Sequence, residues 1–165
     1  MADKAAADKL HLGFLRVISI EAGYVGGLLV TNRIGRPLEF QCTTPVRPNR
    51  TQEVLYGPTL ESYLYCEVLG RTLLDRIAVK PDIILVDQPE LLSLREHCSS
   101  PLLQLHASSS KHGTCVLDSV TVHQGYDEDL AAVDRLKKLI PASADLIEPL
   151  DRVKEALTEA LRAAA

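Results

Sequence analysis

A four-residue apolar run, Ile83–Val86, is the feature that most constrains how this chain can fold. The run is too short for a helix, and Pro81 and Pro89 bound it on either side. A short strand whose residues are all apolar is buried on both faces, and such strands are typical of parallel pairing. The run therefore predicts a parallel strand inside a layered α/β domain.

Three strand-like stretches precede this run. Residues 12–20 and 37–46 alternate apolar and polar side chains, and residues 24–32 follow the break at Glu21–Gly23 as a further strand. Their short connections favour antiparallel hairpins, so they predict a three-stranded antiparallel meander. Periodicity and proline positions then predict the remaining segments: a helix over about 59–77, a short helix from Pro89, a strand over 101–107, a polar loop over 108–113 and a further strand over 115–123.

The ends of the chain complete the expected organisation. Residues 1–10 are polar and rich in alanine, which predicts a flexible lead, and residues 11–165 are expected to form a single domain. Apolar spacing predicts two C-terminal helices, over 127–140 and 147–163. The expected fold class is α/β with some α+β character, in which a mixed sheet combines the meander with β-α-β units.

Composition limits the classes of function. The formal net charge of −4 argues against wholesale binding of nucleic acid or an anionic membrane, although binding of nucleic acid stays possible. The four cysteines lack CxxC spacing, and no secretory signal or membrane-spanning run is recognisable, so the expected location is the cytoplasm. The cysteine and histidine spacings predict no metal site.

The predicted order β-β-β-α-β-α-β over residues 12–107 resembles the ribonuclease H-like superfold, and "PDIILVD" is similar to the fourth strand of endonuclease V-like members. That resemblance implies two Mg²⁺ or Mn²⁺ ions held by carboxylates, which activate water for nucleic-acid cleavage. The candidates that it implies are Glu21 after the first strand, Glu61 or Glu67 on the first long helix, Asp87 after the fourth strand, and Asp127 opening a late helix, where Asp129 follows. Asp87 is equally typical of a residue that caps a helix. Asp127 and Asp129 are equally typical of acidic residues that complement the dipole of the helix they open.

A basic, tyrosine-rich stretch lies between the third strand and the long helix. Pro45 and Pro48 stiffen the backbone there. Arginine and tyrosine on a rigid segment are typical of protein-binding hot spots, whereas a plain connector between strand and helix is the alternative interpretation. The candidate binding residues are Arg33, Arg36, Arg47, Arg50, Tyr56 and Tyr63.

These observations favour a non-catalytic protein-interaction or assembly subunit, whose partner is another protein or a second copy of the chain. The apolar stripe of the last helix either packs on the chain's own sheet or docks to that partner. The alternative is a metal-dependent ribonuclease H-like nuclease. No cofactor is expected under the first interpretation, and Mg²⁺ or Mn²⁺ only under the second.

Overall fold

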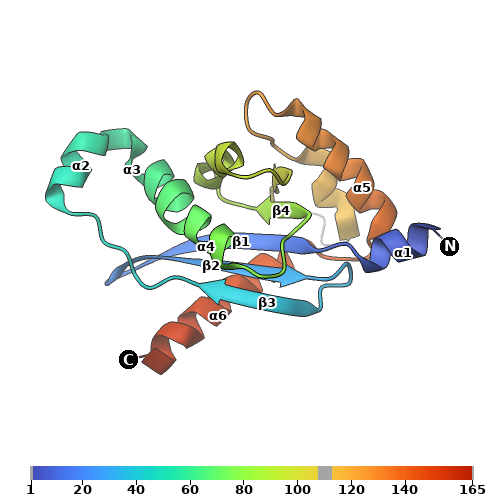
Figure 1. The fold of residues 1–165 in the computed structure, drawn as a ribbon, viewed down its shortest axis with the longest axis horizontal. Coiled ribbons are helices and arrows are strands. Elements are labelled where there is room, and N and C mark those ends of the chain that lie inside the picture. Colours follow the sequence, from blue (N-terminus) through green and yellow to red (C-terminus); the bar gives the residue numbers. More distant parts are fainter. Residues whose placement is uncertain (1, 108–112, 165) are drawn as a thin grey trace.

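The computed structural model of the chain describes residues 2–107 and 113–164. A mixed five-stranded sheet forms its centre, and helices pack on both faces of that sheet (Figure 1). The expected α/β fold with a mixed sheet and C-terminal helices is confirmed.

The sheet has the strand order β3-β2-β1-β4-β5. Strands β1, β2 and β3 form the predicted antiparallel meander. Strand β4 pairs in parallel with β1 on one side and with β5 on the other, as its apolar sequence predicts. The strands span Leu12–Ile20 (β1), Gly23–Thr31 (β2), Pro37–Cys42 (β3), Ile83–Val86 (β4) and Leu102–Gln104 (β5).

The turn between β1 and β2 depends on a glycine. Gly23 has a φ of 130°, which side chains disfavour, and a Cβ there would collide with the Val46 carbonyl oxygen. Val46 comes this close because its backbone pairs with Tyr24 after β3 has ended. The tight hairpin therefore also anchors the chain that leaves the sheet.

The helical segment between β3 and β4 starts earlier than its apolar spacing predicts. Asn49 accepts a hydrogen bond from the Gln52 N–H, and the Gln52 side chain accepts one from the Asn49 N–H. This capping box begins a helix at Arg50, nine residues before the expected start. The segment comprises α2 (Arg50–Tyr56), the 3₁₀ turn η1 (Gly57–Thr59), α3 (Leu60–Ser62), the π-helix η2 (Tyr63–Gly70) and α4 (Arg71–Arg76).

The sheet separates two hydrophobic cores. One lies under η2, α4 and the 3₁₀ helix η3 (Pro89–His97), which occupies the position of the predicted short helix. The other lies under α5 (Ala131–Leu139), which follows the 3₁₀ turn η5 (Asp127–Leu130), and under α6 (Glu148–Ala164). Both C-terminal helices match the predicted ranges to within a few residues. The apolar stripe of α6 packs on the chain's own sheet, against β1 and β2.

One expectation about the chain outside these layers is wrong. The strand predicted over 115–123 is replaced by the 3₁₀ helix η4 (Gly113–Ser119) and one isolated bridge between Thr121 and Gln104. Adjacent Val116 and Leu117 are both buried, which a helical turn allows and an alternating strand does not. Within residues 1–10, Ala2–Asp8 form helix α1, and Leu10 after it is fully buried. Of the polar loop predicted over 108–113, residues 108–112 lie outside the described residues.

Gly27 on β2 lets α6 approach the sheet, because a Cβ there would lie 2.9 Å from Val153 Cγ1 and 3.0 Å from Leu157 Cδ2. We expect Gly27→Val to lower the free energy of unfolding by about 1–3 kcal/mol through overpacking, measured by denaturant titration. Ser19→Val adds the same side chain at an exposed strand position and should change it by less than about 0.5 kcal/mol. Equal effects of the two changes would contradict this packing.

Candidate functional site

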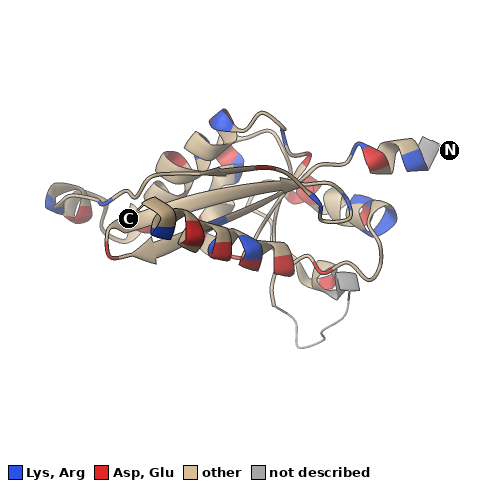
Figure 2. Cartoon of the chain, turned by 90° about the horizontal axis from the view of Figure 1, so that it is seen from below, with Lys and Arg blue, Asp and Glu red and all other residues tan. Residues whose placement is uncertain are grey.

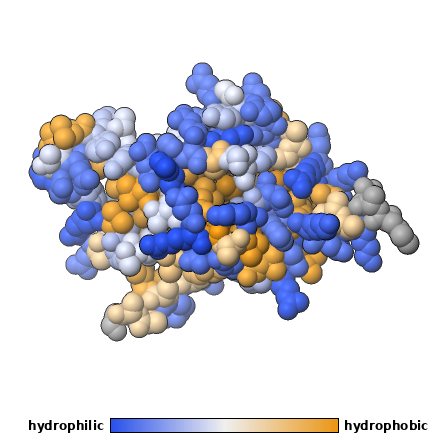
Figure 3. Space-filling view, viewed as in Figure 1, coloured by the Kyte–Doolittle hydropathy of each residue, from blue (hydrophilic) through white to orange (hydrophobic). Residues whose placement is uncertain are grey.

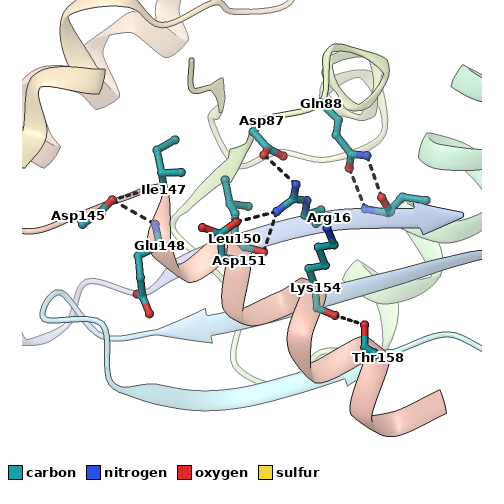
Figure 4. Close-up of polar contacts among 11 residues, drawn as sticks. Arg16, Asp87, Gln88, Asp145, Ile147, Glu148, Leu150, Asp151, Lys154 and Thr158 are labelled. Carbon is teal, nitrogen blue, oxygen red and sulfur yellow. Dashed lines mark hydrogen bonds and ion pairs between the residues drawn. The ribbon is translucent and has the colours of Figure 1, made fainter. Parts of the chain in front are cut away.

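A cluster of three charged side chains lies beside the carboxyl end of β4, where β1, β4 and α6 meet (Figure 4). The Arg16 guanidinium lies between two carboxylates: its Nη2 is 3.7 Å from Asp87 Oδ2, and its Nη1 donates to Asp151 Oδ1 at 3.1 Å. Nη1 also donates to the Leu150 carbonyl oxygen at 3.3 Å. One cation therefore ties the two central strands to the last helix.

Strand register brings Arg16 and Asp87 together. Phe14 of β1 lies opposite Leu85 of β4, and both side chains belong to the core under α6. Side chains two residues further along each strand point to the same face, so Arg16 and Asp87 lie level and face α6. Asp87 Oδ1 is buried and has no hydrogen-bond partner among the described residues, so the ion pair with Arg16 is what compensates this carboxylate.

Gln88, the next residue, extends the pairing of β4 with its side chain. Its Oε1 accepts from the Val17 N–H at 2.8 Å, and its Nε2 donates to the Val17 carbonyl oxygen at 2.8 Å. These two bonds replace the backbone pairing that β4 cannot offer, since the chain turns into η3 at Pro89. Asp87 does not cap η3, because no side chain caps that helix.

The carboxylates implied by the ribonuclease H-like resemblance are not brought together. Glu21 lies in the exposed turn after β1, five residues beyond Arg16, or roughly 16 Å along an extended strand. Glu61 is exposed on α3, and Glu67 on η2 lies 3.7 Å from His97; both are on the face opposite α6. Asp127 is exposed at the start of η5, which packs near the amino end of β5.

This arrangement does not fit a two-metal centre. The residue level with Asp87 on the first strand is Arg16, a cation that pairs with both Asp87 and Asp151. A divalent ion at this place would instead need further oxygen ligands. Within residues 2–107 and 113–164, no group of three His, Cys, Asp or Glu side chains could hold a metal ion. The cluster binds strands to helix and supplies no free carboxylate pair.

Asp129, rather than Asp127, has the defined environment among the late aspartates. It is almost fully buried, and its Oδ2 accepts from Arg95 Nε at 2.8 Å and from the Leu102 N–H at 3.3 Å. The hydrogen bond to Asp129 raises the pKa of Arg95, whose guanidinium also lies 4.4 Å from the centre of the Tyr126 ring. Arg95 and Asp129 therefore clamp η3 to the start of β5, a structural role.

The four candidate arginines do not form one patch. Arg33 and Arg36 lie in the β2–β3 turn, whereas Arg47 and Arg50 follow the Val46–Tyr24 bridge at the other end of β2. Strand β2 has nine residues, so roughly 26 Å separates its ends. Arg33 pairs with Asp8 at 3.6 Å, Arg47 donates to the Glu21 carbonyl oxygen, and Arg50 pairs with Glu53 at 3.2 Å.

Helix α2 and the tyrosines beside it form the most exposed apolar feature at that end. None of the residues of α2 is buried, and Val54 and Leu55 are 65% and 77% exposed. Tyr56 stacks on Tyr63 across the Gly57–Pro58 bend, with ring centres 4.2 Å apart. Figure 2 shows α2 at one extremity of the molecule, away from the sheet, and Figure 3 shows hydrophobic surface at the same tip.

A groove of about 450 Å³ runs between this tip and η3. Tyr56 of α2 and Tyr63 and Glu67 of η2 line the groove, together with Glu96 and His97 of η3. In that groove burial raises the pKa of the Cys66 thiol to about 11, so it is not a reactive nucleophile at neutral pH. The stacked tyrosines and the exposed Val54 and Leu55 therefore give the tip an apolar surface beside this groove.

No protein-family model matches the chain, and no curated protein matches its sequence. Among the described residues, no helix combines the length and the apolar character needed to cross a membrane.

The Arg16 cluster makes a prediction about coupling. Arg16→Met should lower the free energy of unfolding by about 1–3 kcal/mol, because it leaves Asp87 with a buried and uncompensated oxygen. Asp87→Asn removes that charge, so the double variant should lose less than the sum of the single losses, with a coupling of about 0.5–3 kcal/mol by denaturant titration. Arg162→Met, at an exposed ion pair on α6, should cost less than about 1 kcal/mol. Additive losses at Arg16 and Asp87 would show that the two do not interact.

Gln88→Leu should free the Val17 N–H and carbonyl groups and lower the free energy of unfolding by about 1–3 kcal/mol. Hydrogen exchange of the Val17 amide in the native protein should become faster, which separates this local effect from global destabilisation. Gln124→Leu at an exposed position is the control and should leave both quantities unchanged. An unaltered Val17 amide in Gln88→Leu would refute the pairing role.

Proposed function

We propose that this chain is a non-catalytic protein-interaction subunit that binds its partner through α2, Tyr56 and Tyr63. The observation that carries the proposal is a well-capped helix with no buried residue, which presents Val54 and Leu55 to solvent. Large apolar side chains gathered on an exposed tip mark interaction sites in soluble proteins.

The conformation of α2 supports this role. An isolated helix of seven residues is marginal in water, and the core contributes little to α2 because none of its residues is buried. The Asn49–Gln52 capping box and the Tyr56–Tyr63 stack hold it in place instead. A helix fixed before binding loses less conformational entropy when it meets a partner, which raises affinity.

The side chains around α2 define the chemistry of that partner. Arg47 and Arg50 flank the start of the helix, while Val54 and Leu55 provide the apolar contact near its end. A complementary surface offers an apolar groove bordered by acidic side chains, the helix-in-groove mode of recognition. Arg33 and Arg36 belong to the opposite end of the hairpin and are not part of this surface. Nucleic acid is the less favoured partner, because the net charge is −4 and the arginines are divided between two ends.

The ribonuclease H-like resemblance remains part of the proposal at the level of fold. Strand order β3-β2-β1-β4-β5, with an antiparallel meander and two parallel pairs, supports it. Arg16 beside Asp87 favours a non-catalytic member over the alternative, a Mg²⁺- or Mn²⁺-dependent nuclease. The free thiols of Cys42, Cys66 and Cys98 support a reducing location such as the cytoplasm.

The test isolates the bound partner with the wild-type chain and then measures its dissociation constant with variants. We expect Val54→Asp with Leu55→Asp, and separately Arg47→Glu with Arg50→Glu, to weaken binding at least tenfold, about 1.4 kcal/mol or more. Because α2 buries no side chain, thermal stability should change little in the first pair. Arg33→Glu with Arg36→Glu carries the same charge change at the far end and should leave binding unchanged.

Unchanged binding by both α2 variants would refute the proposal. Nucleic-acid cleavage that requires Mg²⁺ or Mn²⁺ and disappears in Asp87→Ala would instead establish the nuclease alternative.

A further inference from the structure

The η3 groove, the space of about 450 Å³ between the α2 tip and η3, carries charge that the apolar contact proposed for α2 does not account for. Segments η2 and η3 pack side by side, and residues of both line the groove (Figure 1). Glu67 comes from η2 and Glu96 from η3. Among the described residues, the lining contains no lysine or arginine. The groove is therefore acidic, whereas the start of α2, beside Arg47 and Arg50, is basic.

Two histidines approach these carboxylates without bringing a fixed charge. His97 Nε2 lies 3.7 Å from Glu67 Oε1, and His123 Nε2 lies 2.7 Å from Glu96 Oε1. A histidine is positively charged only when it is protonated, unlike lysine or arginine. A neutral imidazole that hydrogen-bonds a carboxylate leaves the negative charge in place. The groove therefore keeps its acidic character at every pH at which both histidines are neutral.

Groups inside the groove respond to this charge. Burial raises the pKa of the Cys66 thiol, and the charges of Glu67 and Glu96 add to that rise. A hydrogen bond with Tyr63 raises the pKa of Tyr56, and the charge of Glu67 adds to that rise as well. Both carboxylates therefore lie close enough to charge the interior of the groove.

An aromatic pair lies beside the acidic groups. Tyr63 precedes Glu67 by four residues on η2, and both side chains line the groove. Tyr56 stacks on Tyr63 with ring centres 4.2 Å apart, so the two rings line the groove as one aromatic unit. The face of an aromatic ring attracts a cation. A ring next to a carboxylate therefore selects a cationic group, and the planar guanidinium of arginine is suited to both because it stacks on rings and pairs with carboxylates.

Elsewhere the chain itself binds a guanidinium with these two kinds of group. The Arg95 guanidinium lies 4.4 Å from the centre of the Tyr126 ring, and its Nε donates to Asp129 Oδ2 at 2.8 Å. Tyr63 and Glu67 repeat this combination in the groove, where none of the described arginines is a lining residue. The groove therefore offers the arginine of another molecule the kind of environment that Arg95 has within this one.

We propose that the η3 groove binds an arginine side chain of the partner that α2 recognises, an inference that rests on the proposed function for the existence of that partner. Tyr56 ends α2 and also lines the groove, so the two surfaces are continuous. Charge changes sign along them, because α2 begins beside Arg47 and Arg50 and the groove beyond its end is acidic. The partner then presents acidic side chains, an apolar groove and an arginine in that order, which fixes the orientation in which it docks.

Titration of the full chain with N-acetyl-arginine amide, at constant ionic strength, tests the groove without the partner. We expect the ring-proton NMR signals of Tyr63 to shift with saturation at a dissociation constant of about 10–100 mM, as suits one ring contact and one exposed ion pair. N-acetyl-citrulline amide has the same shape without the charge and should give no saturable shift. Glu67→Gln with Glu96→Gln should remove the arginine response. Glu155→Gln with Glu159→Gln removes two charges from exposed positions on α6 and should preserve it.

Equal responses to the two probes, an arginine response that persists in Glu67→Gln with Glu96→Gln, or no saturable shift in the wild-type chain would overturn the arginine site. With the isolated partner, the same double variant should raise the dissociation constant at least fivefold. Unchanged partner binding in that variant would overturn the inference and leave the role of α2 standing. Weaker partner binding in the groove variant but not in the α2 variants would instead refute the proposed function and leave the arginine site standing.

Discussion

The parallel pairing of β4 with β1 is the constraint on which the rest of the structure depends. β4 has four residues and all are fully buried, so each of its faces needs a helical layer. That requirement separates the two cores and places η3 on one side and α6 on the other. Because β4 is so short, the chain turns away at Asp87 and Gln88, and both side chains are used to complete contacts with β1: an ion pair to Arg16 and two hydrogen bonds to Val17.

The same junction shows why strand order alone does not decide a site. Register places Arg16 of the first strand beside Asp87, whereas Glu21, the first-strand candidate that the ribonuclease H-like resemblance implies, lies five residues further along the chain. The Arg16 guanidinium pairs with both Asp87 and Asp151. The cluster thereby stabilises the meeting of two strands and a helix.

One outer surface is ordered by local contacts that the two cores do not need. On α2, the capping box and the tyrosine stack hold Val54 and Leu55 in a fixed position without burying them. These apolar side chains lie on the same short helix whose start Arg47 and Arg50 flank.

Local pattern alone determined much of this protein: the meander, the buried parallel strand and the two C-terminal helices follow from alternation, proline positions and helical spacing. Local pattern predicted the wrong element over residues 115–123. The burial of Val116 and Leu117 in η4 depends on core residues that are distant in the sequence, which local pattern does not reveal. The candidate site was decided by tertiary structure. Register, which no local spacing encodes, set Arg16 beside Asp87, left Glu21 at the far end of β1 and divided the arginines between two ends of β2. Side chains close in the sequence share a site only when the fold keeps them on one face and at one end of their strands.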